Sequence, residues 1–177
     1  HAAFPDWLKK SIPQVSTLRT EAILQRYGLN TICHSAKCPN RSECFAERTA
    51  TFLILGNLCT RRCTFCSVPQ GIPSGWDPTE PERVARASNE LGLKHVVITS
   101  VTRDDLPDEG AQAFFETILA VKKWIPGVKV EVLTPDFRGK QDAILKVAEA
   151  GPDIYNHNLE TIPRLYRRVR PGALYER

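Results

Sequence analysis

Three cysteines lie close together at positions 59, 63 and 66, in the spacing Cys-x3-Cys-x2-Cys. These gaps are too short for a disulfide framework, and structural zinc sites usually take two separated pairs of ligands. One helical face could also present the three positions as small buried residues. The segment, however, follows a predicted strand, begins with Thr60 and two arginines, and has no helical apolar stripe. Three thiolates in a short loop can instead hold three corners of a cubic iron–sulfur cluster and leave one iron open to a small molecule.

A second group of three cysteines precedes the first, at positions 33, 38 and 44, in the spacing Cys-x4-Cys-x5-Cys. Buried thiols without a metal are one alternative. Another is a zinc site completed by His34, although this residue follows Cys33 directly and would need an awkward turn to join it. A second iron–sulfur cluster is favoured because the first triad already implies that clusters are assembled on this chain.

The composition is that of an ordinary globular protein. The chain has 177 residues, 42% hydrophobic residues and a net charge of +4, which is too weakly basic to indicate nucleic-acid binding. No apolar run approaches a membrane span, and the N-terminus lacks a secretory signal pattern. Clustered cysteines without an export signal indicate reduced thiols, hence the cytoplasm, or an organellar matrix or stroma in a eukaryote. Because methionine is absent, we expect the native start to lie outside this sequence.

Strand and helix patterns alternate from about residue 51 onward, after an N-terminal extension (1–50) with one predicted helix. The pattern predicts strands at 50–57, 94–101, 127–133 and 152–159, and helices at 16–29, 79–93, 109–124, 140–151 and 161–169. Four strand–helix units favour an α/β fold with a parallel sheet, here a partial (β/α) barrel over 51–177. Four units cannot close a barrel, so we expect a larger barrel domain. The first cysteine triad would follow its first strand, where barrel active sites lie.

The first triad, placed after the first strand of such a fold, resembles the radical S-adenosylmethionine (SAM) superfamily. The resemblance implies that the open iron binds the amine and carboxylate of SAM. An electron from the cluster then cleaves SAM to a 5′-deoxyadenosyl radical, which abstracts hydrogen from strong C–H bonds. The cofactors carry this chemistry, and the protein positions them and excludes water.

The two triads together resemble the lipoyl synthase family, within the radical SAM superfamily. The segments "TICHSAKCPNRSEC", "TSVTRDDLPDEGA", "VEVLTPDFRG" and "NHNLETIPRLYRRVRPGA" are similar to that family as well. The resemblance extends from about Pro5 to Arg177. It implies a radical SAM sulfurtransferase of lipoate biosynthesis that inserts two sulfur atoms at C6 and C8 of an octanoyl-lysine.

The same resemblance implies two 4Fe–4S clusters and S-adenosyl-L-methionine as cofactors. Cys59, Cys63 and Cys66 would be catalytic, and the cluster on Cys33, Cys38 and Cys44 would be consumed as the sulfur source. Its fourth ligand in the family is a serine that lies beyond Arg177, so the activity needs more chain than these 177 residues. Two alternatives stay open here: a biotin-synthase-like sulfur insertion, and a non-catalytic iron–sulfur or zinc module.

The expected partners also follow from the resemblance. They are an octanoylated lipoyl carrier domain (of the H-protein or E2 subunit type), a small electron-transfer protein and an iron–sulfur carrier. No nucleic acid and no membrane are expected, and the protein is expected to be a monomer. The exposed arginines near the C-terminus could dock an acidic carrier domain or could be only a solvated helix face.

Further residues are predicted to contact SAM. The backbone of Phe65 would lie near the adenine, although its ring could equally belong to the core. Thr99 and Ser100 would reach the methionine amine, and Arg170 the carboxylate. Asn158 and Glu160, on an extended segment, could bind the ribose hydroxyls.

Two further charged features are noted. Arg103, Asp104 and Asp105, which leave the second predicted strand, could be only a solvated charge cluster. Glu109 occupies a position where the resemblance implies glycine, and we expect a surface loop change with little effect.

Overall fold

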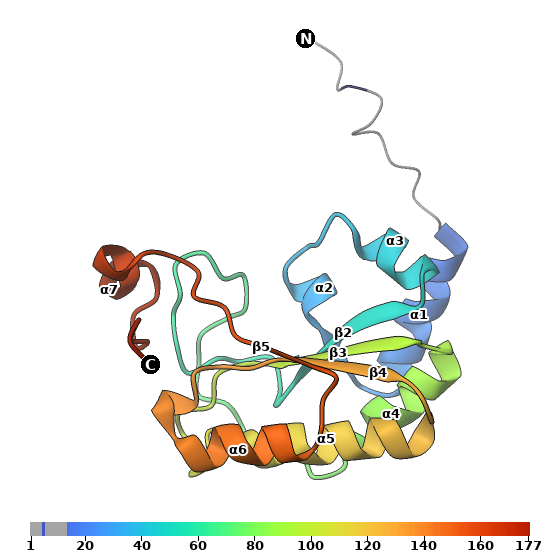
Figure 1. Cartoon of the computed structure of the whole chain (residues 1–177). Helices are drawn as coiled ribbons and strands as arrows, with labels where there is room; N and C mark the ends of the chain where they lie inside the picture. The colour runs from blue at the N-terminus through green and yellow to red at the C-terminus, as the bar shows by residue number, and fades with distance from the viewer. Residues whose placement is uncertain (1–4, 6–13) are drawn as a thin grey trace.

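The computed structural model describes Pro5 and residues 14–177 and contains one five-stranded sheet in the order β1-β2-β3-β4-β5 (Figure 1). The strands are β1 (Asn30–Thr31), β2 (Thr49–Ile54), β3 (His95–Ser100), β4 (Lys129–Leu133) and β5 (Ile154–Asn156). Strands β2 to β5 are parallel, and β1 joins the edge of β2 in the antiparallel direction. The α/β class and the open, partial barrel are therefore confirmed.

Three amphipathic helices connect the parallel strands and cover one face of the sheet (Figure 1). They are α4 (Glu80–Leu91), α5 (Ala111–Trp124) and α6 (Gln141–Glu149). Alternate strand residues such as Val96 and Ile98 are fully buried, and in register with them lie Val130 and Val132 of β4. Because side chains alternate across a strand, the residues between them are left on the other face of the sheet. Among the described residues, no helix is both long and apolar enough to cross a membrane.

The N-terminal extension contains more structure than the sequence predicts. Besides the predicted helix α1 (Gln14–Arg26), it forms β1 and two short helices, α2 (Ile32–Ser35) and α3 (Arg41–Ala46). A two-residue strand and helices of one or two turns are too short for a periodic pattern. Arg83 of α4 donates hydrogen bonds to the carbonyl oxygens of Tyr27 and Gly28, at 2.6 and 3.1 Å. These bonds attach the end of α1 to the helical layer and so fix the extension against the sheet edge.

The last predicted strand is shorter than expected. Strand β5 ends at Asn156, and the following segment turns, with Glu160 in the left-handed region at φ 66°. Beyond it, the predicted helix becomes a 3-10 turn η3 (Pro163–Leu165) followed by the single-turn helix α7 (Tyr166–Val169). A further 3-10 turn, η2 (Phe137–Gly139), precedes α6.

The chain turns sharply between β2 and the cysteine loop, at Leu55, whose φ is 68°. The buried carboxylate of Glu80 accepts a hydrogen bond from the Leu55 amide at 2.8 Å. Arg103 donates to the carbonyl oxygen of Leu55 at 3.3 Å. A β-carbon at Gly110 would collide with the Leu55 side chain. Such a strained backbone persists only where its neighbours fix it, as they do here.

The alternative that Arg103 belongs to a solvated charge cluster is wrong. Only 1% of Arg103 is exposed. Its guanidinium lies beside the turn that follows β2 and donates to the carbonyl oxygens of Leu55 and Ser74. Asp105 neutralises it through two hydrogen bonds of 2.9 and 2.8 Å. Burying this charge is tolerable because nearly all its donors have acceptors.

Glu109 is also not the surface change that the sequence suggests. It is 1% exposed and adopts φ 56°, next to Gly110 at φ 89°. One carboxylate oxygen lies 2.7 Å from Nζ of Lys140, which keeps the buried charge paired. A glutamate here therefore carries backbone strain and a desolvation cost that glycine would avoid.

Two substitutions separate these contributions at position 109. Both Glu109→Gly and Glu109→Ala remove the carboxylate, but only alanine retains a β-carbon at a positive φ. We expect the glycine variant to be more stable than the alanine variant by about 1 kcal/mol. Urea unfolding of both variants measures this difference, and equal stabilities would show that the backbone at this position is not strained.

Candidate functional site

The loop that carries Cys59, Cys63 and Cys66 has no regular secondary structure and is fixed by contacts with its neighbours. At its start, the Cys59 amide donates to Pro69 O (2.9 Å), and the Thr60 amide donates to Thr102 O beyond β3 (3.1 Å). In its middle, the Thr64 amide donates to the carbonyl oxygen of Val169 at 2.9 Å. The loop is therefore attached both to the exit of β3 and to the end of α7.

The three thiols line one cavity of about 400 Å³ at the carboxyl ends of the parallel strands. Its walls come from the cysteine loop, the exits of β3 and β4, the segment after β5 and helix α2. All nine predicted catalytic and SAM-contacting residues line this cavity, namely Cys59, Cys63, Phe65, Cys66, Thr99, Ser100, Asn158, Glu160 and Arg170. The structure thus brings the set together, while the role of each residue toward a cofactor stays a prediction.

The polar residues in the cavity differ in how free they are to bind a ligand. The Thr99 hydroxyl donates to Leu133 O at 2.9 Å and bridges β3 to β4, whereas the buried Ser100 hydroxyl has no hydrogen-bond partner. Arg170 donates to Asn158 O and to the Tyr166 hydroxyl, so it holds the segment after β5 in place. Of the two predicted hydroxyls, Ser100 is therefore the one available for hydrogen bonding.

Two predictions about local geometry at this site are wrong. Asn158 and Glu160 both line the cavity, but not from an extended strand, because β5 has already ended and Glu160 has φ 66°. The alternative that the Phe65 ring belongs to the core also fails, since this residue is 52% exposed at the cavity.

The thiols of each triad lie near enough to influence one another electrostatically. Burial raises the pKa of the Cys63 thiol, and Cys59 and Cys66 raise it further, although Arg170 and Arg61 oppose this effect. Burial and then Cys33 and Cys38 likewise raise the pKa of Cys44. A raised pKa keeps a thiol protonated until iron displaces the proton. The cavity beside Cys59, Cys63 and Cys66 is large enough for a small molecule.

The second triad lies next to another cavity, of about 620 Å³, which includes Cys38 and the cysteine-loop residues Ser67 and Pro69. Helix α2 borders both cavities: Ile32 lines the first, together with Ala36 just after the helix, and His34 and Ser35 line the second. Within residues 14–177 and Pro5, no three His, Cys, Asp or Glu side chains converge on one point as a single metal ion requires. Since thiolates on one zinc ion lie within about 4 Å of each other, the arrangement gives no support to a zinc site with His34.

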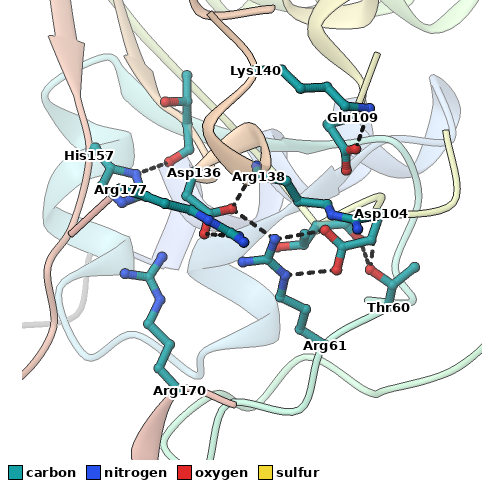
Figure 2. Close-up of polar contacts among 12 residues, drawn as sticks. Thr60, Arg61, Asp104, Glu109, Asp136, Arg138, Lys140, His157, Arg170 and Arg177 are labelled. Atoms are coloured by element: carbon teal, nitrogen blue, oxygen red, sulfur yellow. Dashed lines mark hydrogen bonds and ion pairs between the residues drawn. The ribbon is translucent and has the colours of Figure 1, made fainter. Parts of the chain in front are cut away.

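A buried ionic cluster, which the sequence did not predict, lies behind the cysteine loop (Figure 2). The guanidinium of Arg61 donates to both carboxylate oxygens of Asp104, at 2.8 and 2.7 Å, and to Asp136 Oδ1 at 2.7 Å. The Arg61 and Asp136 side chains are each only 4% exposed. Asp104 is therefore an ion-pair partner rather than part of a solvated cluster. The sequence shows two adjacent arginines, Arg61 and Arg62, but it does not show which of them is buried.

Comparison with known proteins agrees with this geometry. The family model described as "Radical SAM superfamily" matches residues 53–177. This range contains the first triad, the end of β2 and the strands β3, β4 and β5. The chain belongs to the radical SAM superfamily. A solved structure, that of methylornithine synthase, superimposes with a TM-score of 0.53 over 95% of this chain and 46% of its own, at 17% identity. At that identity, the likeness concerns the fold alone.

Relatives within the superfamily are much more similar in sequence. The lipoyl synthase of Caldanaerobacter subterraneus subsp. tengcongensis is 60% identical over 98% of this chain and 61% of its own length. The lipoyl synthase of Rhodopirellula baltica is 54% identical over 94% of this chain and 53% of its own. The chain therefore spans between about half and three fifths of the length of these relatives.

The ionic cluster should make the stability of this radical SAM fold depend on pH. Burial alone would raise the pKa of Asp136, but hydrogen bonds and charge from Arg61 outweigh it and lower the pKa. The stability that Asp136 provides is therefore complete above the ordinary aspartate pKa of about 3.9, and is lost as pH falls through the lowered value.

Asp136→Asn should consequently unfold more easily at pH 7 and lose less stability than the parent chain between pH 7 and 3. Urea unfolding of the cluster-free chain across this pH range measures the effect. The exposed Asp142, in the first turn of α6, provides a control, because its asparagine variant should follow the parent curve. Parallel curves for Asp136→Asn and the parent would contradict the assignment.

Proposed function

We propose that this chain is the catalytic part of a lipoyl synthase, a radical SAM sulfurtransferase that inserts sulfur at C6 and C8 of a protein-bound octanoyl-lysine. The observation that carries the proposal is the presence of two separate thiol triads beside adjacent cavities that share the wall formed by α2. The relatives named lipoyl synthase support it, since they align over 94–98% of this chain and hence over both triads.

Cys59, Cys63 and Cys66 are the residues that would hold a 4Fe–4S cluster whose fourth iron stays open to SAM. When bound, this cluster supplies the electron that cleaves SAM, and SAM supplies the hydrogen-abstracting chemistry. The chain's own residues orient the cofactor: the unpartnered Ser100 hydroxyl offers a hydrogen bond, and Arg170 offers positive charge. Asn158 and Glu160 line the same cavity as candidate ribose ligands.

Cys33, Cys38 and Cys44 would hold the second cluster, which serves as the sulfur source. Cys33 is buried and Cys44 half-buried, while Cys38 reaches the second cavity beside the cysteine loop. All six cysteines are free thiols, as cluster ligation requires. A reducing compartment such as the cytoplasm suits such thiols, and a small electron-transfer protein and an iron–sulfur carrier would supply electrons and cluster.

Cys63→Ala should abolish SAM cleavage because it removes a ligand of the open cluster, whereas Cys38→Ala should retain SAM cleavage and lose sulfur insertion. Anaerobic reconstitution of the full-length protein, followed by mass spectrometry of an octanoyl-lysine peptide, measures both reactions. Two such clusters imply about eight iron and eight sulfide per chain. Equal loss of SAM cleavage in two correctly folded variants, or stoichiometric zinc without sulfide, would contradict the proposal.

The octanoylated lipoyl carrier domain would dock beside α7. Arg164, Arg167 and Arg168 are exposed there, and none of them forms an ion pair within residues 14–177. The end of α7 contacts the cysteine loop through Val169, so a partner bound to these arginines would lie near the cavity. Unpaired cations at the edge of a site attract an acidic partner and speed its association.

Exchanging these three arginines for glutamate should raise KM for an acidic carrier domain about tenfold at low salt, because attraction becomes repulsion. KM for a short octanoyl-lysine peptide should stay unchanged, since the peptide lacks the acidic surface. Lys123→Glu, at an exposed position at the far end of α5, serves as the control for a charge reversal away from α7. An equal rise of KM for both substrates would argue against docking at α7.

A further inference from the structure

Arg61 lies within the cysteine loop but does not line the cavity. Its side chain is 4% exposed, in contrast to the neighbouring Arg62, which is exposed and forms no side-chain hydrogen bond or ion pair within the described chain. The two adjacent arginines therefore point to different environments, one into the protein and one into solvent. Apart from the effect of its charge on the Cys63 thiol, Arg61 can act on a ligand in the cavity through the backbone that carries Cys59 and Cys63.

The contacts of Arg61 join three segments that come from different strand exits. Asp104 follows β3, Asp136 follows β4, and Arg61 itself belongs to the loop after β2. The planar guanidinium matches Asp104 with two parallel hydrogen bonds and still has a donor for Asp136, a geometry that a lysine ammonium cannot reproduce. One side chain thus sets the spacing between the cysteine loop and two neighbouring strand exits (Figure 2).

Both carboxylates are themselves held in place. The Asp104 amide donates to Thr60 Oγ1 at 3.2 Å, and this hydroxyl donates in turn to Thr102 O at 3.0 Å. Asp136 Oδ1 also accepts from the Arg138 amide at 3.1 Å, and Arg177 approaches Oδ2 at 3.6 Å. Asp136 is therefore an acceptor that is fixed from outside the loop, while the bond between Asp104 and Thr60 joins the loop to the segment after β3 a second time.

The later part of the chain closes over the same side chain. Gly172, at φ 93°, lies against Arg61, since a β-carbon there would come within 3.4 Å of Arg61 Cδ. Positive φ and this close approach both favour glycine at position 172. The segment after α7 is thereby packed on the guanidinium that holds the cysteine loop, while α7 itself binds that loop through Thr64.

We propose that Arg61 is a positioning residue that sets the spacing of the Cys59, Cys63 and Cys66 thiols by fixing their loop to the exits of β3 and β4. The inference rests on the proposed cluster at these thiols. It does not depend on the sulfur acceptor or on the second triad. A ligand constellation held by buried neighbours loses its geometry when the supporting contact is removed, even if the ligands remain.

Arg61→Lys and Arg61→Gln test this in the full-length protein, with Arg62→Gln as the matched control. In the cluster-free chain, hydrogen exchange of the amides of residues 59–66 should become at least tenfold faster in both Arg61 variants. After reconstitution, iron should be lost to a chelator at least tenfold faster, and the SAM-induced change in the EPR spectrum should be altered. Arg62→Gln should match the parent in all three measurements.

The outcomes separate positioning from general stability. Should Arg61→Gln not fold, two other variants provide the same test. Arg61→Lys retains the positive charge, and Asp104→Asn retains Arg61 and its bond to Asp136. A parent-like EPR response and chelator resistance in folded Arg61 variants would overturn the inference, even with a lowered melting temperature. These measurements need no octanoyl substrate, so failure of sulfur insertion would count against the proposed function and not against this role.

Discussion

A loop without regular secondary structure must bring three thiols to one place, and the surrounding architecture follows from this constraint. Helices and strands fix their residues through periodic backbone hydrogen bonds, but residues 59–66 have few of these. The loop depends instead on one buried arginine and on hydrogen bonds to the segment after β3 and to the end of α7. The arginine is stable inside the protein because two carboxylates accept its hydrogen bonds.

The turn that leads into this loop shows the same dependence on distant residues. Leu55 adopts a left-handed conformation that leucine rarely takes, and it is held by Glu80 and Arg103 on its polar groups and by Gly110 against its side chain. Burial raises the pKa of Glu80, although the hydrogen bond from the Leu55 amide opposes this. The strain at Leu55 is thus maintained by residues far from it in the sequence, at the start of α4 and in the connection between β3 and α5.

The second triad is positioned by a different device. Its extension adds β1 to the sheet edge and binds α4 through Arg83, so that α2 lies between the two cavities. The proposed sulfur source and the proposed radical site therefore share a wall, although their ligands come from opposite sides of β2 in the sequence. An extension without a periodic pattern gains its order from these contacts and not from local propensity.

The parallel strands and the helices α4, α5 and α6 could be predicted because buried β-branched runs and amphipathic helices repeat with clear periods. The strand β1 and the helices α2 and α3 could not, because each is too short for its pattern to repeat. The end of β5 was predicted too late in the sequence, because the turn that follows it has a positive φ at Glu160, and glutamate does not signal such a turn as glycine would. Glu109 was misplaced on the surface for a similar reason.

The sequence by itself determined which residues could do chemistry: two triads of thiols, placed before and directly after the first parallel strand. It also determined that polar residues at strand ends would meet at one edge, since parallel strands end together. Only the tertiary structure decided which charged residues are buried. Arg61 and Arg62 are identical in local sequence terms, and their separate fates depend on carboxylates 43 and 75 residues away from Arg61. Desolvation and pairing are properties of a folded environment, which no local pattern records.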